Sequence, residues 1–151
     1  MRILPVPTAK VAVQIRHKLE KEDDTWAEEA RNLAAALLKA LTKEGKDNDR
    51  ERQLRNIQSM AAQSNSWRAL ELFIRYQAAR KEIPKEWAEQ TIETLEKLQE
   101  NARSLLHNIT ASPDPELLKA IHLELVARTL GYAVRWHVWD TKGKEKTHEH
   151  V

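Results

Sequence analysis

The shortage of residues that interrupt helices is the feature that most limits how this chain can fold. Glycine occurs three times and proline five times among 151 residues, while alanine, leucine, glutamate, lysine, arginine and glutamine dominate. These six residue types lose little side-chain freedom in a helix, whereas glycine and proline weaken or break one. Long helices joined by short turns are therefore expected, and no part of the pattern requires a β-strand.

Apolar residues recur at intervals of three and four along most of the chain, the spacing that lines one face of an α-helix. Ser66 and Asp114 stand where N-caps are needed, because their side chains accept hydrogen bonds from the free N–H groups of a first turn. Pro84 and Pro115 suit the first helical position, which needs no N–H donor. These signals predict helices over about residues 24–45, 50–63, 67–83, 84–107 and 115–139.

The first segment is less regular. Residues 8–21 have a loose helical spacing and are interpreted as a helix, although Val11 and Val13 would also suit a strand. A polar stretch near residues 45–50 predicts a mobile connection. A chain of this length buries one core, and its 41% hydrophobic and 32% charged residues fit a soluble globular domain. The prediction is an all-α fold, a compact single-domain bundle of five to six helices over residues 8–140, with flexible tails at 1–7 and 141–151.

Cysteine is absent, which excludes a disulfide framework, thiolate catalysis and cysteine-ligated zinc. The short apolar run at the N-terminus is interrupted by Pro5 and Pro7, so it does not fit a signal peptide, and no later run has the length of a membrane span. A cytoplasmic protein with no membrane partner is expected.

No pattern of catalytic residues stands out. Gly45, Gly131 and Gly143 are too far apart to form a phosphate-cradling loop. The histidines at 17, 107, 122 and 137 have no metal-ligand spacing and are expected to be structural or exposed. His148 and His150 lie in a predicted tail without rigid geometry. We expect a protein that is not an enzyme and holds no metal or cofactor.

Arginine is the residue that helical spacing aligns into faces. Residues 67–81 contain four basic residues and one acid, whereas residues 85–100 contain two basic residues and five acids. This asymmetry fits either a basic stripe that follows a phosphate backbone or ion pairs between helices beside a solvated face. The acidic segment would also suit a basic face on a neighbouring copy. The candidate nucleic-acid-binding residues are Arg52, Arg55, Arg75, Arg80, Arg128 and Arg135.

Five tryptophans raise the question of base stacking. Trp67 and Trp87 fall on apolar stripes and are predicted to belong to the core. Trp136 and Trp139 could serve as core, as interface or as a stacking platform, in that order of preference.

Two short motifs resemble a known family. The segments QLRNIQSM and LFIRYQAAR are similar to the paired motifs of the small helical subunit of type III-A CRISPR effector complexes, the Csm small subunit. The resemblance extends over about residues 50–139, and Ala79 stands where the family often has glycine. The matched motif residues are Leu54, Arg55 and Asn56, then Tyr76, Gln77, Ala78, Ala79 and Arg80.

The resemblance implies a non-catalytic subunit that stacks in several copies and contacts guide RNA, target RNA and other subunits of the complex. Arg55 and Arg80 would contact the RNA backbone on this reading, while Tyr76 and Gln77 would either join them or only orient the helix. The alternative is a helical protein–protein adaptor or oligomerisation module, either a head-to-tail stack or a dimer. Convergence of Arg52, Arg55, Arg80 and Arg128 on one exposed face free of carboxylates would favour RNA binding, and pairing of each with a glutamate would favour the adaptor.

Overall fold

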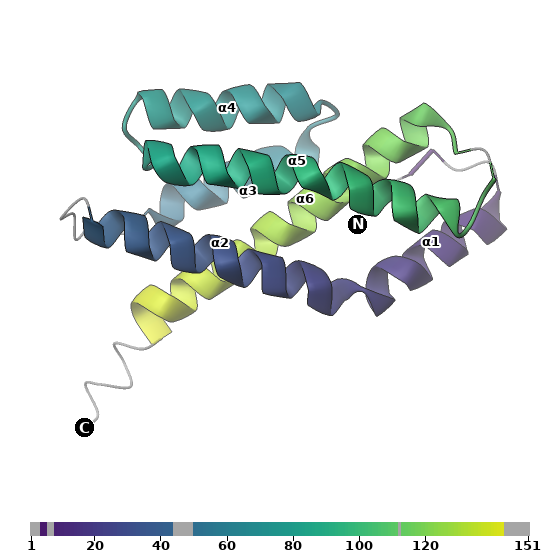
Figure 1. Ribbon diagram of the computed structural model, residues 1–151, viewed down its shortest axis with the longest axis horizontal. Helices are drawn as coiled ribbons and strands as arrows, with labels where there is room; N and C mark the ends of the chain where they lie inside the picture. Colours follow the sequence, from purple (N-terminus) through teal and green to yellow (C-terminus); the bar gives the residue numbers. More distant parts are fainter. Residues whose placement is uncertain (1–3, 6–7, 44–49, 112, 144–151) are drawn as a thin grey trace.

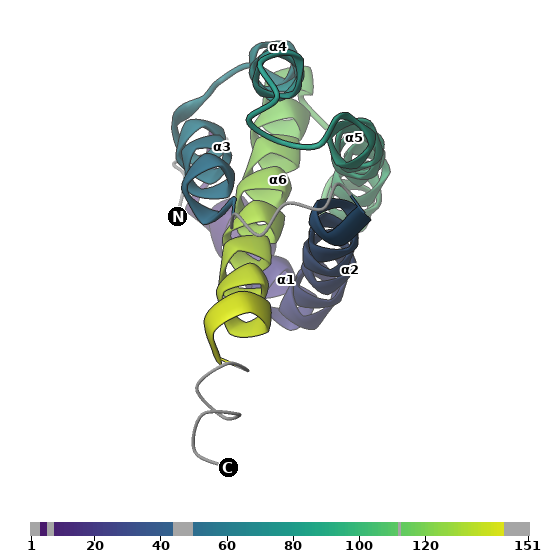
Figure 2. The ribbon, with the colours of Figure 1, turned by 90° about the vertical axis from the view of Figure 1, so that its left-hand side faces the viewer.

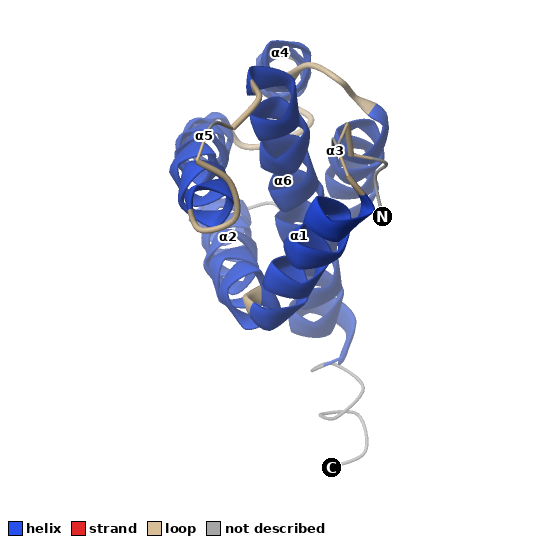
Figure 3. Cartoon of the chain, turned by 90° about the vertical axis from the view of Figure 1, so that its right-hand side faces the viewer, coloured by secondary structure: helices blue, strands red, loops and turns tan. Residues whose placement is uncertain are grey.

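A computed structural model describes residues 4–5, 8–43, 50–111 and 113–143. These residues form six α-helices and one π-helical turn, with no strand among them, so the predicted all-α bundle is confirmed (Figures 1 and 3). The elements are α1 (Ala9–Lys21), α2 (Asp23–Lys43), α3 (Glu51–Gln63), α4 (Trp67–Ala79), α5 (Lys85–His107), α6 (Pro115–Val138) and η1 (Trp139–Gly143).

Helix α6 lies at the centre of the bundle. Figure 2 shows it in the middle, with α3, α4, α5 and α2 arranged around it. It packs mainly against α2, α3 and α5. Twelve of its 24 residues are buried, and they are distributed around the helix rather than along one stripe. A helix that is buried on several sides needs other helices packed around it, so α6 forms the centre of the core.

Polar caps define the helix starts. Thr8 accepts a hydrogen bond from the Val11 N–H at 3.2 Å and caps α1, so the first segment is a helix and not a strand. Ser66 accepts from the Ala69 N–H at 3.1 Å, and Asp114 accepts from the Glu116 N–H at 3.0 Å, as predicted. Pro115 opens α6 in the predicted first position. Pro84 is the N-cap residue of α5, one position earlier than predicted.

Helix α4 ends four residues earlier than the sequence predicted. The prediction continued it to residue 83, but the helix ends at Ala79 and its chain reverses around Lys81, which has a φ of 62°. The Glu82 N–H donates to the Gln77 carbonyl at 2.9 Å and the Lys81 N–H to the Ala78 carbonyl at 3.0 Å. This is the Schellman arrangement, which normally places glycine at the position of Lys81. The prediction was wrong because the sequence has lysine, not glycine, at the left-handed position that ends the helix.

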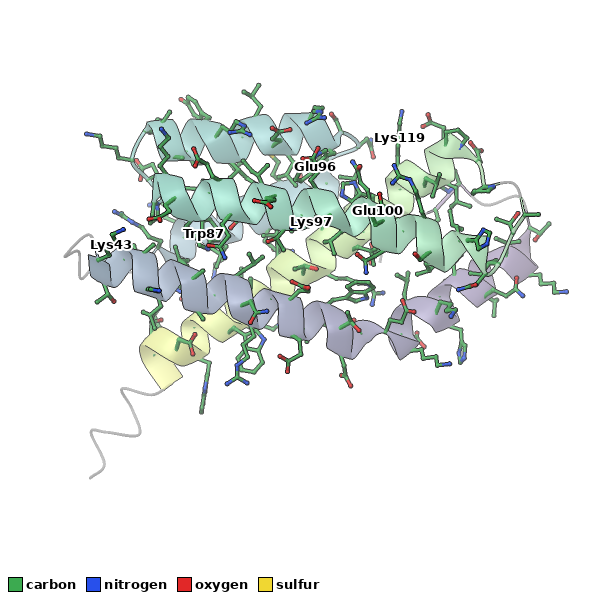
Figure 4. All side chains as sticks on the ribbon, viewed as in Figure 1. Lys43, Trp87, Glu96, Lys97, Glu100 and Lys119 are labelled. Atoms are coloured by element: carbon green, nitrogen blue, oxygen red, sulfur yellow. The ribbon has the colours of Figure 1, made fainter. Side chains whose placement is uncertain are left out.

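The aromatic residues separate into buried and exposed groups. Trp67 and Trp87 are buried, as predicted, and the Trp87 Nε1–H donates to the Leu33 carbonyl at 2.9 Å. Figure 4 shows Trp87 between α5 and α2. Trp136 is half-buried and donates to the Ala27 carbonyl at 3.0 Å, so it belongs to the α2–α6 contact. Trp139 is exposed.

The C-terminal end of the helical region extends beyond the predicted boundary at residue 140. The Thr141 hydroxyl donates to the His137 carbonyl at 2.8 Å, and Lys142 pairs with Glu51 of α3 at 2.7 Å. These contacts hold η1 against the bundle. The remaining predicted tail and the predicted mobile connection lie mostly outside the described residues, as does the histidine pair at 148 and 150.

His122 is a buried titratable group within the core. Its Nε2 lies 2.9 Å from the Leu95 carbonyl oxygen, and because a carbonyl only accepts, Nε2 carries the proton. The ring meets Trp67 edge-on, with centroids 5.3 Å apart. Burial lowers the pKa of His122 below its ordinary 6.5; the hydrogen bond to Leu95 and the charge of Glu96 oppose this, and Arg103 adds to it.

Lowering the pH should therefore destabilise the fold through His122. The unfolded chain takes up a proton at this residue near pH 6.5, whereas the folded chain does so only at lower pH, so the free energy of unfolding decreases as the pH falls below that value. We expect His122→Gln to reduce this decrease, and His107→Gln, at an exposed histidine, to leave it unchanged. Urea unfolding between pH 7.5 and 5 measures the difference, and equal pH dependence in all three proteins would contradict the assignment.

Candidate nucleic-acid interface

The structure distributes the predicted arginines over three places rather than one face. The places are helices α3 and α6, which carry Arg52, Arg55 and Arg135, the α2–α6 contact with Arg128, and the C-terminal part of α4 with Arg75 and the C-cap residue Arg80.

A groove of about 430 Å³ lies between α3 and α6. Arg55 of α3 and Arg135 of α6 line it together, although they are far apart in the sequence. Gly131 leaves its floor open, since a Cβ built there would meet no other atom within 4 Å. The remaining lining residues are Gln58, Val134 and Val138. Two guanidinium groups and an amide at an open groove can donate several hydrogen bonds to phosphate oxygens.

Arg55 forms only a weak, exposed ion pair with Glu51. Its Nε donates to Glu51 at 3.0 Å, and 56% of the side chain is exposed. Such a pair one turn apart on a helix surface contributes only about 0.3–0.5 kcal/mol. A phosphate could therefore replace Glu51 as the partner of Arg55 at small free-energy cost.

Glu51 itself is held by two cations. The hydrogen bond from Lys142 and then that from Arg55 lower the pKa of Glu51 below its ordinary value, so it is ionised at neutral pH. Lys142 would keep Glu51 paired if Arg55 turned towards a ligand, because the two carboxylate oxygens accept from different cations.

The other two candidate arginines of α3 and α6 are exposed as well. Arg135 is exposed and its guanidinium carbon lies 5.4 Å from the centroid of the Tyr132 ring, which steadies it without neutralising its charge. Arg52 is also exposed, lies three residues before Arg55 on α3, and makes no ion pair with any residue that the structure describes.

Arg128 is a structural residue. Its Nε donates to Glu124 at 2.8 Å and its Nη1 to Asp23 of α2 at 3.2 Å, and only 20% of the side chain is exposed. The Tyr132 hydroxyl donates to the same Asp23. Burial alone would lower the pKa of Arg128, but the bonds to Glu124 and Asp23 raise it above its ordinary value. Arg128 thus joins α6 to α2 and is not presented to a ligand.

Helix α4 carries its arginines beside acids and an aromatic ring. Arg75 donates to Glu71 at 3.1 Å. The hydrogen bond from Arg68 lowers the pKa of Glu71 below its ordinary value. Burial opposes this effect, and the hydrogen bond from Arg75 adds to it. Arg80 lies over the Tyr76 ring, 5.3 Å from its centroid, and its Nη2 is 3.8 Å from Glu82.

One ion pair joins the basic surface of α4 to the acidic surface of α5. Arg68 pairs with Glu96 of α5 at 3.5 Å. Figure 4 shows Glu96 on the side of α5 towards α4. Lys97 pairs with Glu93 on the same helix at 3.2 Å, so part of the acidic surface is balanced locally.

The candidate arginines fit neither of the two sequence predictions completely, because Arg52 makes no ion pair with a described residue whereas three others do. Arg55, Arg80 and Arg128 each lie beside a carboxylate, so the carboxylate-free face expected of an RNA-binding stripe is not formed. The α3–α6 groove nevertheless brings together Arg55 from the resembling motif and Arg135 from helical spacing.

Two residues of this surface were missed in the sequence. Gln58 lies three residues after Arg55, so helical spacing could have indicated it. Lys142 lies in the segment predicted as a tail, and only the π-helical turn brings it to Glu51. No local pattern indicated that contact.

Comparison with protein-family models, with curated proteins and with solved structures finds no match to the chain. The resemblance of the paired motifs thus remains a prediction from their residues. Within the described part of the chain, no helix is both long and apolar enough to span a membrane, and no group of three potential metal ligands is present.

Replacing Arg128 should destabilise the fold. Arg128→Ala removes a cation from beside the buried Glu124 and the half-buried Asp23, so we expect the free energy of unfolding to fall by about 2–3 kcal/mol. Arg103→Ala, at an exposed pair on α5, is the control and should change it by less than about 0.5 kcal/mol. Urea denaturation distinguishes the two, and equal effects would exclude a structural role for Arg128.

Proposed function

We propose that this protein is a non-catalytic small subunit of a type III CRISPR ribonucleoprotein effector complex and contacts the guide RNA or target RNA backbone. The observation that carries the proposal is the meeting of Arg55 and Arg135 at one groove between α3 and α6. Arg55 belongs to the motif that resembles the Csm small subunit, and Arg135 was selected independently from helical spacing. Their convergence supports a shared phosphate-binding role.

The chemistry of the groove suits a backbone rather than a base sequence. Guanidinium groups fit phosphate oxygens, which carry no base identity, and in such complexes pairing with the guide supplies specificity. Three exposed arginines on one small domain give weak binding that decreases with salt. Several stacked copies would strengthen it by multivalency.

A second candidate function is a protein–protein adaptor without a nucleic-acid role. The pairing of Arg55, Arg80 and Arg128 with acids favours it. So do two large apolar side chains on the outer surface of α4, Leu72 and Tyr76, which are 68% and 54% exposed. The two functions differ in whether RNA binds the α3–α6 groove.

Binding of a fluorescent oligouridylate across a salt series tests the proposal. Because each phosphate contact on a single strand adds about 0.7 to the slope of log affinity against log salt, loss of two contacts should lower the slope by about 1.4. We expect Arg55→Ala combined with Arg135→Ala to weaken binding at low salt and to flatten the slope by about that amount.

The control replaces two exposed arginines that lie away from the groove, Arg68→Ala with Arg103→Ala, and circular dichroism verifies unchanged helicity in all variants. This pair should leave the slope nearly unchanged. No binding at 50 mM salt, or equal losses in both double variants, would reject the α3–α6 groove as an RNA site and favour the adaptor.

A further inference from the structure

A second groove, of about 550 Å³, lies where α4 ends and α5 begins. Its size falls in the range of ligand-binding clefts. Small and branched apolar residues form its floor, and charged residues stand at its edge. The apolar residues are Ala78, Ala79, Ile83, Ala88 and Ile92, and the charged ones are Arg75, Lys81, Lys85 and Glu89.

Lys81 occupies a position at this groove where glycine would be more stable. Its φ of 62° lies in the left-handed region, where a Cβ crowds the following carbonyl oxygen and destabilises the backbone. The C-terminal Schellman arrangement of α4 needs only the backbone conformation and not a lysine side chain. A strained residue that persists at a cleft indicates that its side chain has a use.

The charges around the groove are unequal. Arg75, Lys81 and Lys85 face one acid, Glu89, within the lining. Arg75 is already paired with Glu71, whereas Lys81 and Lys85 are exposed and make no ion pair with any described residue. Two accessible ammonium groups thus stand over an apolar floor.

An extended RNA backbone suits this groove poorly. A phosphate chain would gain nothing from the apolar floor formed by Ile83 and Ile92 and would meet the carboxylate of Glu89. A peptide with aspartate or glutamate beside leucine-like residues matches both features, because its carboxylates reach the lysines while its apolar side chains cover the floor.

We propose that the α4–α5 groove is a docking site for a short acidic, apolar segment of a partner protein, with Lys81 and Lys85 as the carboxylate-binding residues. The α3–α6 groove has a different lining, so this site does not depend on RNA binding. Lys81 is then retained at the end of α4 for binding, at the expense of stability.

The test uses three probes on the whole chain: an eight-residue peptide that alternates aspartate and leucine, the same peptide with asparagine for aspartate, and an octauridylate. We expect the acidic peptide to bind at least fivefold more tightly than the asparagine peptide and to shift the backbone amide resonances of residues 79–92. The octauridylate should leave those resonances in place.

Lys81→Gly separates binding from folding. It should raise the midpoint of thermal unfolding by about 2–4 °C, because glycine relieves the backbone strain. It should also weaken binding of the acidic peptide at least threefold. Combining it with Lys85→Ala should abolish the preference for the acidic peptide. The control Lys97→Ala with Lys119→Ala, at two exposed lysines elsewhere, should preserve that preference.

Three results would overturn the proposal: no binding of the acidic peptide, equal binding of the asparagine peptide, or unchanged binding after loss of both groove lysines. Displacement of the same resonances by the octauridylate would instead assign the groove to nucleic acid. Success or failure of the α3–α6 experiment leaves each of these results interpretable, because Arg55 and Arg135 are intact in every variant.

Discussion

The burial of α6 on several sides determines where the other helices of the bundle lie. Leu125, Val126 and Leu130 lose all contact with water only if α2, α3 and α5 cover the helix together. Each covering helix then exposes an outer surface and leaves a groove beside its neighbour. The two candidate sites lie at the edges of this arrangement, one between α3 and α6 and one where α4 turns into α5.

Polar groups on α6 show how the central helix fixes its neighbours. Arg128 and Tyr132 reach the same carboxylate, Asp23, at the start of α2, and Trp136 reaches the Ala27 carbonyl one turn further. Polar bonds of this kind, made at the edge of a core, specify how one helix is placed along another. With α2 held in this way, Arg135 remains exposed on the side towards α3, where it can meet Arg55.

Features encoded within one helical turn were predictable where the residue types signal them, and features that need distant residues were not. The capping oxygens of Ser66 and Asp114 act on N–H groups two or three residues away, so their patterns are visible in the sequence. The end of α4 was missed because Lys81 takes a conformation that the sequence signals only through glycine or asparagine. Arg128 was predicted as an RNA contact from its helical spacing to Arg135, and no local pattern could show that its partner is Asp23, 105 residues away. Arg55 and Arg135 are both exposed, and their role as RNA contacts stays a prediction; that they line the same groove could not be seen in the sequence, because it requires the packing of α3 on α6.

Photo-crosslinking from the α3–α6 groove can show whether RNA lies between these two helices, since it reports position rather than affinity. Benzoylphenylalanine would replace Gln58, which lines the groove between the two arginines' helices, and in a matched protein Gln90 on the exposed side of α5. We expect irradiation with labelled oligouridylate at low salt to crosslink the protein substituted at Gln58 and to leave the one substituted at Gln90 largely unlinked. Equal crosslinking from both positions, or crosslinking from position 90 alone, would contradict an RNA-binding surface between α3 and α6.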